Sequence, residues 1–214
     1  MKLLFIGNSH TYYNSLPETV ARLLDTTGYK PHVTMLAEGG KGLAYHLSSP
    51  NAALNIRCGK YDVVVAQDRA SSFEPSAFRD AAKALGEMVE RAGSQMVLYM
   101  PWAGRNNRGA QRAMTETYHS FCRANNCPMA PVGEVFTRIL QTEPPAAIFR
   151  EDGNHATPFG SYIAAVTIFY TVTGRKRVIN VGTINDPGIA AGFPTELCQR
   201  VHTEACRMSR LYNG

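Results

Sequence analysis

The sequence predicts an α/β fold, a three-layer α/β/α sandwich built around a parallel sheet of about five strands. Short segments rich in apolar and β-branched residues alternate along the chain with longer segments of helical periodicity. The short segments are apolar almost throughout, as expected of parallel strands that are covered on both faces. With 214 residues, 44% of them hydrophobic, the chain is long enough for a single domain over residues 1–214.

The predicted strands are five short apolar segments: Lys2–Ile6, His32–Leu36, Asp62–Ala66, Gln95–Met100 and Met129–Val132. In open α/β sheets, ligands bind beyond the carboxyl ends of the strands. We therefore expect chemistry in the polar or glycine-rich loops that follow the strands. Four loops of this kind are Gly7–Asn14, Glu38–Gly42, Gln67–Ser72 and Trp102–Gly109, and a fifth polar loop, Gln141–Thr157, joins a short helix to the next helix.

Five longer segments have the apolar spacing of helices. The first begins with the capping-box pattern Ser15-Leu16-Pro17-Glu18 and ends at Gly28. The second, Ser76–Ala92, repeats apolar residues on one face and is followed by Gly93. The remaining helices are predicted at about Ala110–Asn125, Pro158–Thr173 and Thr195–Leu211, the last as an amphipathic helix that closes the chain.

Charge and composition argue against several classes of partner. The 22 basic and 17 acidic residues give a net charge of +5, but no run of five basic residues occurs, so a nucleic-acid partner is not expected. The cluster Arg175-Lys176-Arg177 follows a predicted helix end, where cations complement exposed carbonyl groups. No run of 18 apolar residues predicts a membrane span.

The amino terminus and the cysteines favour a cytoplasmic protein. The apolar stretch Leu3–Ile6 is too short for a signal peptide, although a chain whose leader had been removed would look the same. Five cysteines are an odd count, which excludes a complete intramolecular disulfide framework. We therefore expect reduced thiols.

No cofactor or metal is expected. The chain lacks both the dinucleotide-binding glycine motif and the phosphate-binding motif Gly-x-x-x-x-Gly-Lys-Ser/Thr. Cys198, His202 and Cys206 lie on one stripe of the last helix and could in principle ligate zinc. Structural zinc sites need four ligands, usually gathered from turns, so a buried helix face is the favoured interpretation.

Two polar loops carry the residue types of a serine hydrolase. Ser9 follows the first strand in Gly7-Asn8-Ser9-His10-Thr11, although serine in such a turn is often only a turn former. Asp152 precedes His155 by three residues, a spacing that also suits a loop in which the aspartate caps a helix. Taken together, the two loops could supply a nucleophile, a base, and a carboxylate that orients the base.

In these two blocks the sequence resembles the SGNH or GDSL-type hydrolases, over about Lys2 to Gly174. That family places its nucleophile after the first strand and an Asp-x-x-His near the carboxyl end, and here Asn8 stands where Asp is commonest. The resemblance implies a flavodoxin-like strand order, Ser9 as nucleophile, His155 as general base and then acid, and Asp152 as the residue that orients His155. Residues 157–174 also resemble the following helix in a poorly characterised branch of the family.

The resemblance further implies an oxyanion hole, a set of N–H donors that stabilise the charge of the tetrahedral intermediate. The glycine block aligns with Glu38–Gly42 and assigns the donor to Gly40, with Gly39 as the alternative. The family's third block usually reads Gly-x-Asn-Asp, whereas this chain has Ala66-Gln67-Asp68. Gln67 is therefore assigned to the oxyanion hole by position, because its carboxamide carries the same N–H donors as asparagine.

The expected reaction is hydrolysis of small, acetyl-like esters through an acyl-Ser9 intermediate. The loops are dominated by polar residues, with Tyr12, Tyr13 and Trp102 as the main apolar surfaces, which favours a small acyl group on a polar, sugar-like alcohol. The Trp102 loop is either a carbohydrate-recognition edge or a flexible surface loop. His10 is either a pocket residue or a structural one. Two alternatives remain: a lipolytic lysophospholipase or thioesterase, and a non-catalytic glycan-binding domain.

Overall fold

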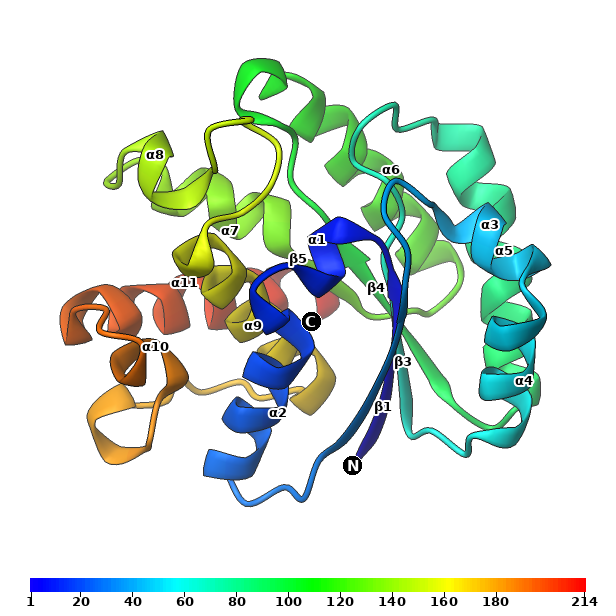
Figure 1. The fold of residues 1–214 in the computed structure, drawn as a ribbon, viewed down its shortest axis with the longest axis horizontal. Helices are drawn as coiled ribbons and strands as arrows, with labels where there is room; N and C mark the ends of the chain where they lie inside the picture. Colours follow the sequence, from blue (N-terminus) through cyan, green and yellow to red (C-terminus); the bar gives the residue numbers. More distant parts are fainter.

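Five parallel strands form a single sheet in the order β2-β1-β3-β4-β5, which is the flavodoxin-like order. The computed structural model describes residues 1–214, and Figure 1 shows helices on both faces of its sheet. The strands are β1 Lys2–Gly7, β2 His32–Ala37, β3 Val63–Ala66, β4 Gln95–Met100 and β5 Met129–Pro131. Each predicted strand is present, with bounds that differ by at most one residue. The predicted sandwich around a parallel sheet is therefore confirmed.

The helices include several short ones that the sequence pattern did not predict. The predicted helices correspond to α2 Leu16–Thr26, α5 Pro75–Arg91, α6 Ala110–Ala124, α9 Pro158–Thr173 and α11 Thr195–Asn213. The additional elements are α1 Ser9–Tyr12, α3 Leu43–Ser48, α4 Pro50–Cys58, α7 Val132–Ile139, α8 Pro145–Ile148 and α10 Pro187–Ala190, with 3₁₀ turns η1 Tyr13–Ser15, η2 Arg105–Asn107 and η3 Val181–Thr183. These elements are nine residues long or shorter, too short for periodicity to identify.

Two hydrophobic cores lie on opposite faces of the sheet. Side chains alternate between the two faces of a strand, so Leu3 and Phe5 of β1 enter one core while Leu4 and Ile6 enter the other. The first core contains residues of α2, α7, α9 and α11, and the second contains residues of α3 to α6. In Figure 1 these two sets of helices lie on the left and on the right of the sheet.

Helix α9 is a central helix, buried on all sides. Thirteen of its sixteen residues, Phe159 to Thr171, are buried, whereas a helix at the surface buries only one face. The first core gathers side chains of α2, α7 and α11 around it. The nearly unbroken apolar sequence of α9 is the signal of this position.

The predicted capping box at Ser15 is wrong. Asn14 and Ser15 have φ angles of 54° and 50°, and the Ser15 side chain makes no capping hydrogen bond. Asparagine tolerates this left-handed conformation better than most residues. A tertiary contact fixes it, because Asn14 Nδ2 donates to the carbonyl oxygen of Ala156 at 3.0 Å and to Ser161 Oγ at 2.8 Å.

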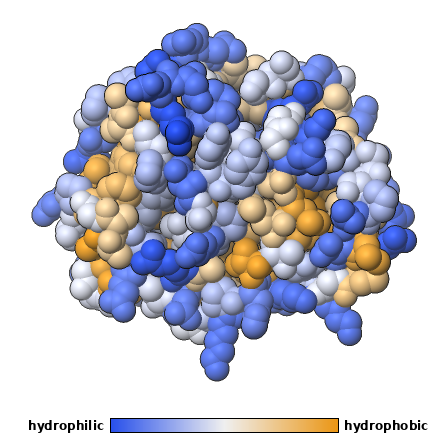
Figure 2. All heavy atoms as spheres, in the orientation of Figure 1, coloured by the Kyte–Doolittle hydropathy of each residue, from blue (hydrophilic) through white to orange (hydrophobic).

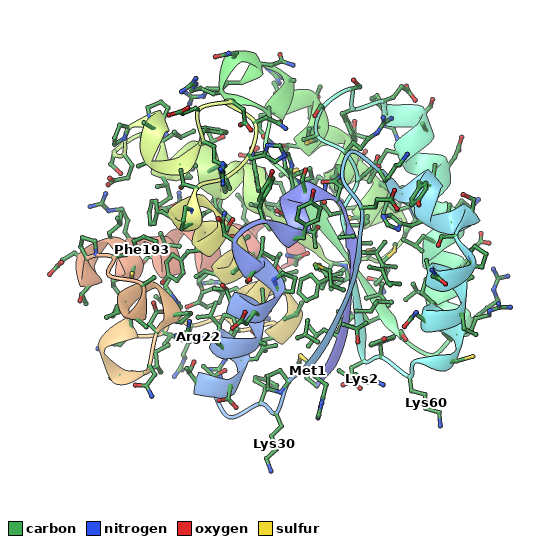
Figure 3. The ribbon with its side chains drawn as sticks, in the orientation of Figure 1. Met1, Lys2, Arg22, Lys30, Lys60 and Phe193 are labelled. Atoms are coloured by element: carbon green, nitrogen blue, oxygen red, sulfur yellow. The ribbon has the colours of Figure 1, made fainter.

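The surface is mixed, and no helix is long and apolar enough to cross a membrane. Figure 2 shows a face that is largely hydrophilic, with separate hydrophobic residues. Lys2, Lys30 and Lys60 lie along the edge of the sheet at which β1, β2 and β3 begin (Figure 3). The loops of chemical interest lie at the opposite edge, beyond the carboxyl ends of the strands.

Gly7, the last residue of β1, has no room for a side chain. A Cβ at this position would lie 2.2 Å from Thr11 Oγ1 and 2.6 Å from Gln67 Oε1. Both of those atoms belong to a buried network behind Ser9. The close approach therefore requires glycine.

We expect Gly7→Ala to lower the free energy of unfolding by about 3 kcal/mol, because either the network or the strand must move to accommodate the methyl group. Urea denaturation monitored by circular dichroism measures this change. Gly109→Ala is the matched control, since its Cβ would meet nothing within 4 Å and its φ angle is −60°. Equal stability of the two variants would contradict the packing argument.

Candidate active site

Ser9 is the first residue of the short helix α1, directly after the turn that ends β1. Asn8 caps this helix, because its Oδ1 accepts a hydrogen bond from the His10 amide at 3.1 Å. Its Nδ2 donates to the carbonyl oxygen of Lys41 at 2.9 Å. Asn8 thus joins the Ser9 turn to the glycine turn after β2. The second bond explains why asparagine suits this position better than aspartate, which has no N–H to donate.

Asp152 and His155 are held in one tight loop before α9. Asp152 Oδ1 accepts the backbone amides of Asn154 and His155 at 2.8 and 2.9 Å. Asp152 Oδ2 accepts a bond from His155 Nδ1 at 2.6 Å. The hydrogen bond from the His155 ring, together with the two amides, holds the pKa of the Asp152 carboxyl well below its usual range. The carboxylate therefore stays ionised and fixes His155 in one tautomer.

The two loops meet, although they are 146 residues apart in the chain. His155 Nε2 lies 2.9 Å from Ser9 Oγ, and the His155 side chain is 21% exposed. With Nδ1–H directed at Asp152, Nε2 is free to accept the hydroxyl proton of Ser9. The structure thus brings Ser9, His155 and Asp152 into one continuous hydrogen-bonded chain.

Trp102 connects the Ser9 loop with the His155 loop. Its indole Nε1–H donates to the carbonyl oxygen of Asn154 at 2.8 Å. One face of the indole stacks on the His10 ring at a centroid distance of 4.4 Å, and the other stacks on Phe136, also at 4.4 Å. Trp102 is only 1% exposed, so its indole cannot stack on a sugar ring, whereas Asn106 to Gly109 of the same loop are exposed at the surface. Both of its faces are occupied within the protein.

His10 lies beside the triad as a neutral ring. It is 4% exposed, and it meets His155 edge-on at a centroid distance of 5.7 Å. Burial, reinforced by the nearby His155, lowers the pKa of His10 to about 3. Its Nδ1 is buried without a hydrogen-bond partner. His10 therefore has a structural role in the stack and also borders the cavity at Ser9.

Gly40 and Gln67 are placed differently from each other. Gly40 borders the cavity at Ser9 and has a φ angle of +71°, which glycine adopts at little cost, and its amide has no hydrogen-bond partner. Gln67 is completely buried, and its Oε1 accepts bonds from the Asn8 amide at 3.1 Å and from Thr11 Oγ1 at 2.8 Å.

This placement does not fit the donor role predicted for Gln67. Its Nε2 donates to the Asp68 carbonyl oxygen, and the side chain does not border the cavity. Turning the carboxamide over would set its N–H groups against the amide N–H of Asn8. Gln67 instead supports the Ser9 turn through its bonds to the Asn8 amide and Thr11 Oγ1. The side chain of glutamine is one methylene longer than that of asparagine, which lets it reach these groups. The sequence indicated this different role only by having glutamine at position 67, where the family usually has asparagine.

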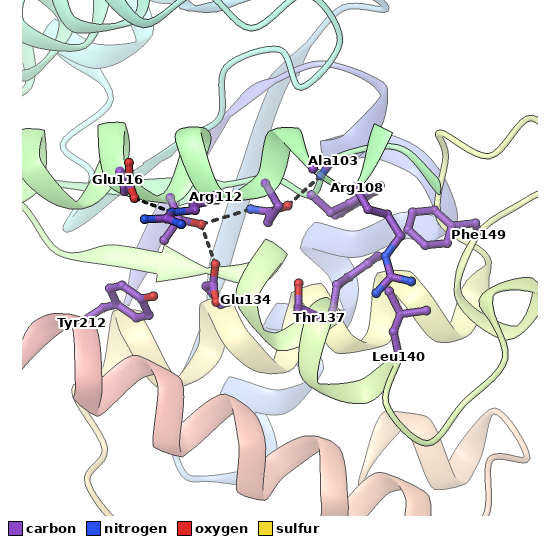
Figure 4. Close-up of a pocket in the computed structure, with 14 residues that line it drawn as sticks. Ala103, Arg108, Arg112, Glu116, Glu134, Thr137, Leu140, Phe149 and Tyr212 are labelled. Atoms are coloured by element: carbon purple, nitrogen blue, oxygen red, sulfur yellow. Dashed lines mark hydrogen bonds and ion pairs between the residues drawn. The ribbon is translucent and has the colours of Figure 1, made fainter. Parts of the chain in front are cut away.

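The cavity over Ser9 has a volume of about 280 Å³ and a polar lining. Its ten lining residues include a single hydrophobic one, Ala70, and they comprise Asn8, Ser9, His10, Gly40, Arg69, Ala70, Ser71, Ser72, Asn154 and His155. A larger pocket of about 820 Å³ lies between α6 and α7, and Trp102 is among its lining residues (Figure 4). None of the triad residues borders that pocket. The smaller cavity is therefore the one at which Ser9 could react.

The three residues considered as zinc ligands lie in the protein interior, and the histidine among them is hydrogen-bonded. Cys198, His202 and Cys206 are all buried. The His202 ring bonds through Nδ1 to Tyr170 at 3.0 Å and through Nε2 to Asp186 at 3.0 Å. The interpretation as a buried helix face is confirmed.

We expect Asn8→Asp to lower the free energy of unfolding by about 2–3 kcal/mol, although aspartate is common in the family at this position. A carboxylate oxygen would face the Lys41 carbonyl oxygen where a hydrogen bond is now made. Chemical denaturation at neutral pH measures the change. The control is Asn51→Asp on the exposed surface of α4, which should leave stability within about 0.5 kcal/mol of the parent. Unchanged stability in Asn8→Asp would rule out the explanation given for this residue.

We expect His10 to make the protein less stable as the pH falls from about 6.5 to about 3. The unfolded chain takes up a proton on His10 below about pH 6.5, whereas the folded state keeps the ring neutral until about pH 3. The loss approaches about 1.4 kcal/mol per pH unit. His10→Phe, which preserves the stacking, should flatten the dependence of stability on pH, whereas exposed His32→Gln should not. Parallel curves for the parent and His10→Phe would contradict the assignment.

The chain matches no family model and no curated protein. Among solved structures, a candidate SGNH hydrolase from Slackia heliotrinireducens is 26% identical, with a TM-score of 0.70, over 80% of this chain and 98% of that one. An acetylxylan esterase from Geobacillus stearothermophilus, Axe2, is 15% identical, with a TM-score of 0.67, over 80% and 93%.

A protein of the DUF4886 family from Bacteroides uniformis is 18% identical, with a TM-score of 0.66. The match covers 100% of this chain and 96% of that protein, so its fold also includes the C-terminal helices. The resemblance detected in the sequence is thus confirmed by independent structures. The structural neighbours of this chain are SGNH hydrolases, and the chain has the SGNH-hydrolase fold.

Proposed function

We propose that this protein is a serine esterase that hydrolyses small acyl esters through an acyl-Ser9 intermediate. The observation that carries the proposal is the continuous chain from Ser9 Oγ through His155 to Asp152, with contacts of 2.9 and 2.6 Å. Nucleophile, base and orienting carboxylate are the three parts that such chemistry requires. The fold shared with esterases supports the same conclusion.

In the acylation step, Ser9 Oγ attacks the carbonyl carbon of the ester and its proton passes to His155 Nε2. Asp152 stabilises the imidazolium that forms, because its carboxylate accepts the Nδ1–H bond and stays ionised. The tetrahedral intermediate then collapses, and His155 returns the proton to the leaving alkoxide. The alcohol departs and Ser9 remains acylated.

In the deacylation step, water takes the place of the alcohol. His155 removes a proton from the water as it attacks the acyl carbon, and then gives that proton to Ser9 Oγ as the acyl bond breaks. The free carboxylic acid leaves and Ser9 is regenerated. Each cycle consumes one ester and one water and yields one acid and one alcohol, with no other reactant.

The Gly40 amide is the proposed donor to the oxyanion. It borders the same cavity as Ser9 and has no partner within the protein, so it is free to donate. Asn8 holds the glycine turn against the Ser9 turn through the Lys41 carbonyl oxygen. A donor fixed in this way costs no reorganisation when charge develops.

The cavity favours a short acyl group. A volume of about 280 Å³ with a single hydrophobic lining residue offers little apolar surface to a long chain. We therefore propose acetyl-like esters of polar alcohols, with carbohydrate esters among them, over fatty acyl substrates. The acetylxylan esterases among the solved structures of this fold are consistent with that choice.

We expect Ser9→Ala and His155→Ala each to lower kcat for 4-nitrophenyl acetate by about 10⁴-fold or more. The double variant should be no slower than either single variant, because the two residues act as one unit. Ser120→Ala and His32→Ala, at the exposed surface, are the matched controls and should keep the parent rate. Retained hydrolysis in Ser9→Ala would show that another residue is the nucleophile.

We expect kcat/KM to be highest for acetyl and propionyl esters and to fall as the chain lengthens toward palmitoyl, because the polar cavity gains little from added methylenes. A series of 4-nitrophenyl esters, run beside acetylated xylan and other acetylated sugars, measures this trend. A rate that climbs steadily with chain length would favour the lipolytic alternative. Absence of turnover on every ester would favour a binding domain.

A further inference from the structure

One wall of the cavity at Ser9 carries hydrogen-bonding groups that nothing in the protein uses. Arg69, Ser71 and Ser72 belong to the loop after β3 and border the cavity, and their side chains form no hydrogen bond or ion pair. The φ angle of Ser72 is 54°, a left-handed conformation that few non-glycine residues adopt. Such backbone conformations concentrate at ligand-binding and active sites.

Arg69 is the only permanently charged residue that borders the cavity, and no acidic residue does. Its stem lies beside the glycine turn, because a Cβ on Gly42 would lie 3.4 Å from Arg69 Cγ. The Arg69 stem therefore lies beside the turn that contains Gly40, and the residue itself is exposed.

The neighbouring carboxylates are already engaged elsewhere. Asp68 Oδ1 accepts the Leu43 amide at 2.9 Å, and Asp152 is bonded to His155. Glu38 accepts the hydroxyl of Tyr45 at 2.5 Å. None of these acids forms an ion pair with Arg69, so its charge is available to a ligand.

We propose that the substrate of Ser9 carries a carboxylate group, which Arg69 binds together with the hydroxyl groups of Ser71 and Ser72. This inference rests on the proposed esterase function and specifies the substrate class. Guanidinium and carboxylate match in shape and charge, and two hydroxyl groups can donate to the remaining lone pairs. A carboxylate matches the single positive charge, whereas a phosphate dianion would remain half-compensated.

Two pairs of esters test the proposal, each differing by carboxylate against carboxamide. The first pair places the group on the alcohol, as in 3-acetoxyphenylacetate and 3-acetoxyphenylacetamide. The second places it on the acyl part, as in the phenyl monoester of glutaric acid and the phenyl ester of glutaramic acid. The variants are Arg69→Gln and Arg69→Lys, with Arg22→Gln as the matched control on the exposed surface of α2 (Figure 3).

We expect the parent to hydrolyse the carboxylate member of one pair with a kcat/KM about tenfold higher than that of its carboxamide. That preference should disappear in Arg69→Gln, persist in part in Arg69→Lys and remain intact in Arg22→Gln. Rates on the carboxamides should fall far less than rates on the carboxylates in the two Arg69 variants, and should stay unchanged in Arg22→Gln. The pair that responds identifies whether the alcohol or the acyl part carries the charge. Equal rates within both pairs, or a preference that survives Arg69→Gln, would overturn the proposal.

A binding measurement separates this proposal from the esterase proposal. The ligands are 3-hydroxyphenylacetate and glutarate, the products that keep the tested carboxylate, and isothermal titration calorimetry measures their affinity. We expect at least one of them to bind the parent, and to bind Arg69→Gln about tenfold more weakly. Binding that is lost in Arg69→Gln, without turnover of any ester, would support the carboxylate site and contradict the esterase. Turnover of the carboxamides without binding of either product would support the esterase and overturn the carboxylate site.

Discussion

The site depends on one hydrogen bond between parts of the chain that are far apart, from Ser9 Oγ to His155 Nε2 at 2.9 Å. A contact over 146 residues survives only if both loops are fixed independently of it. Trp102 fixes them together, because its ring stacks on His10 beside Ser9 while its N–H holds the carbonyl oxygen of Asn154 beside His155. Trp102 therefore does not stack on a carbohydrate; it holds the Ser9 loop and the His155 loop together inside the protein.

The buried polar atoms behind Ser9 explain two departures from the usual family pattern. Asn8 needs an N–H to reach the Lys41 carbonyl oxygen, which aspartate lacks. Gln67 needs length to reach the Asn8 amide and Thr11 Oγ1 from its buried position. Gly7 leaves room for both. Gly7, Asn8 and Gln67 together support the Ser9 turn, so the departures at positions 8 and 67 belong to one hydrogen-bonded arrangement.

The strands and the Asp152–His155 pair could be predicted because their signals are local, whereas the pairing of His155 with Ser9, 146 residues away, was implied by the family resemblance. Each strand is a short apolar segment, and Asp152 and His155 lie in one loop. Asn14 could not be predicted as a tie to the His155 loop, because its partners Ala156 and Ser161 are distant in the chain and its left-handed φ angle has no sequence signature beyond residue type. The burial of Trp102 and Gln67 could not be predicted for a related reason, because the burial of a loop residue depends on which distant segments pack against the loop.

Covalent trapping with a fluorophosphonate, followed by peptide mass spectrometry, tests the central claim most directly. If Ser9 is an activated nucleophile, the parent should carry one adduct, located on Ser9. The adduct should be absent in Ser9→Ala and should form far more slowly in His155→Ala, because the hydroxyl then lacks its base. An unlabelled parent, or an adduct on Ser71 or Ser72 in its place, would contradict the account.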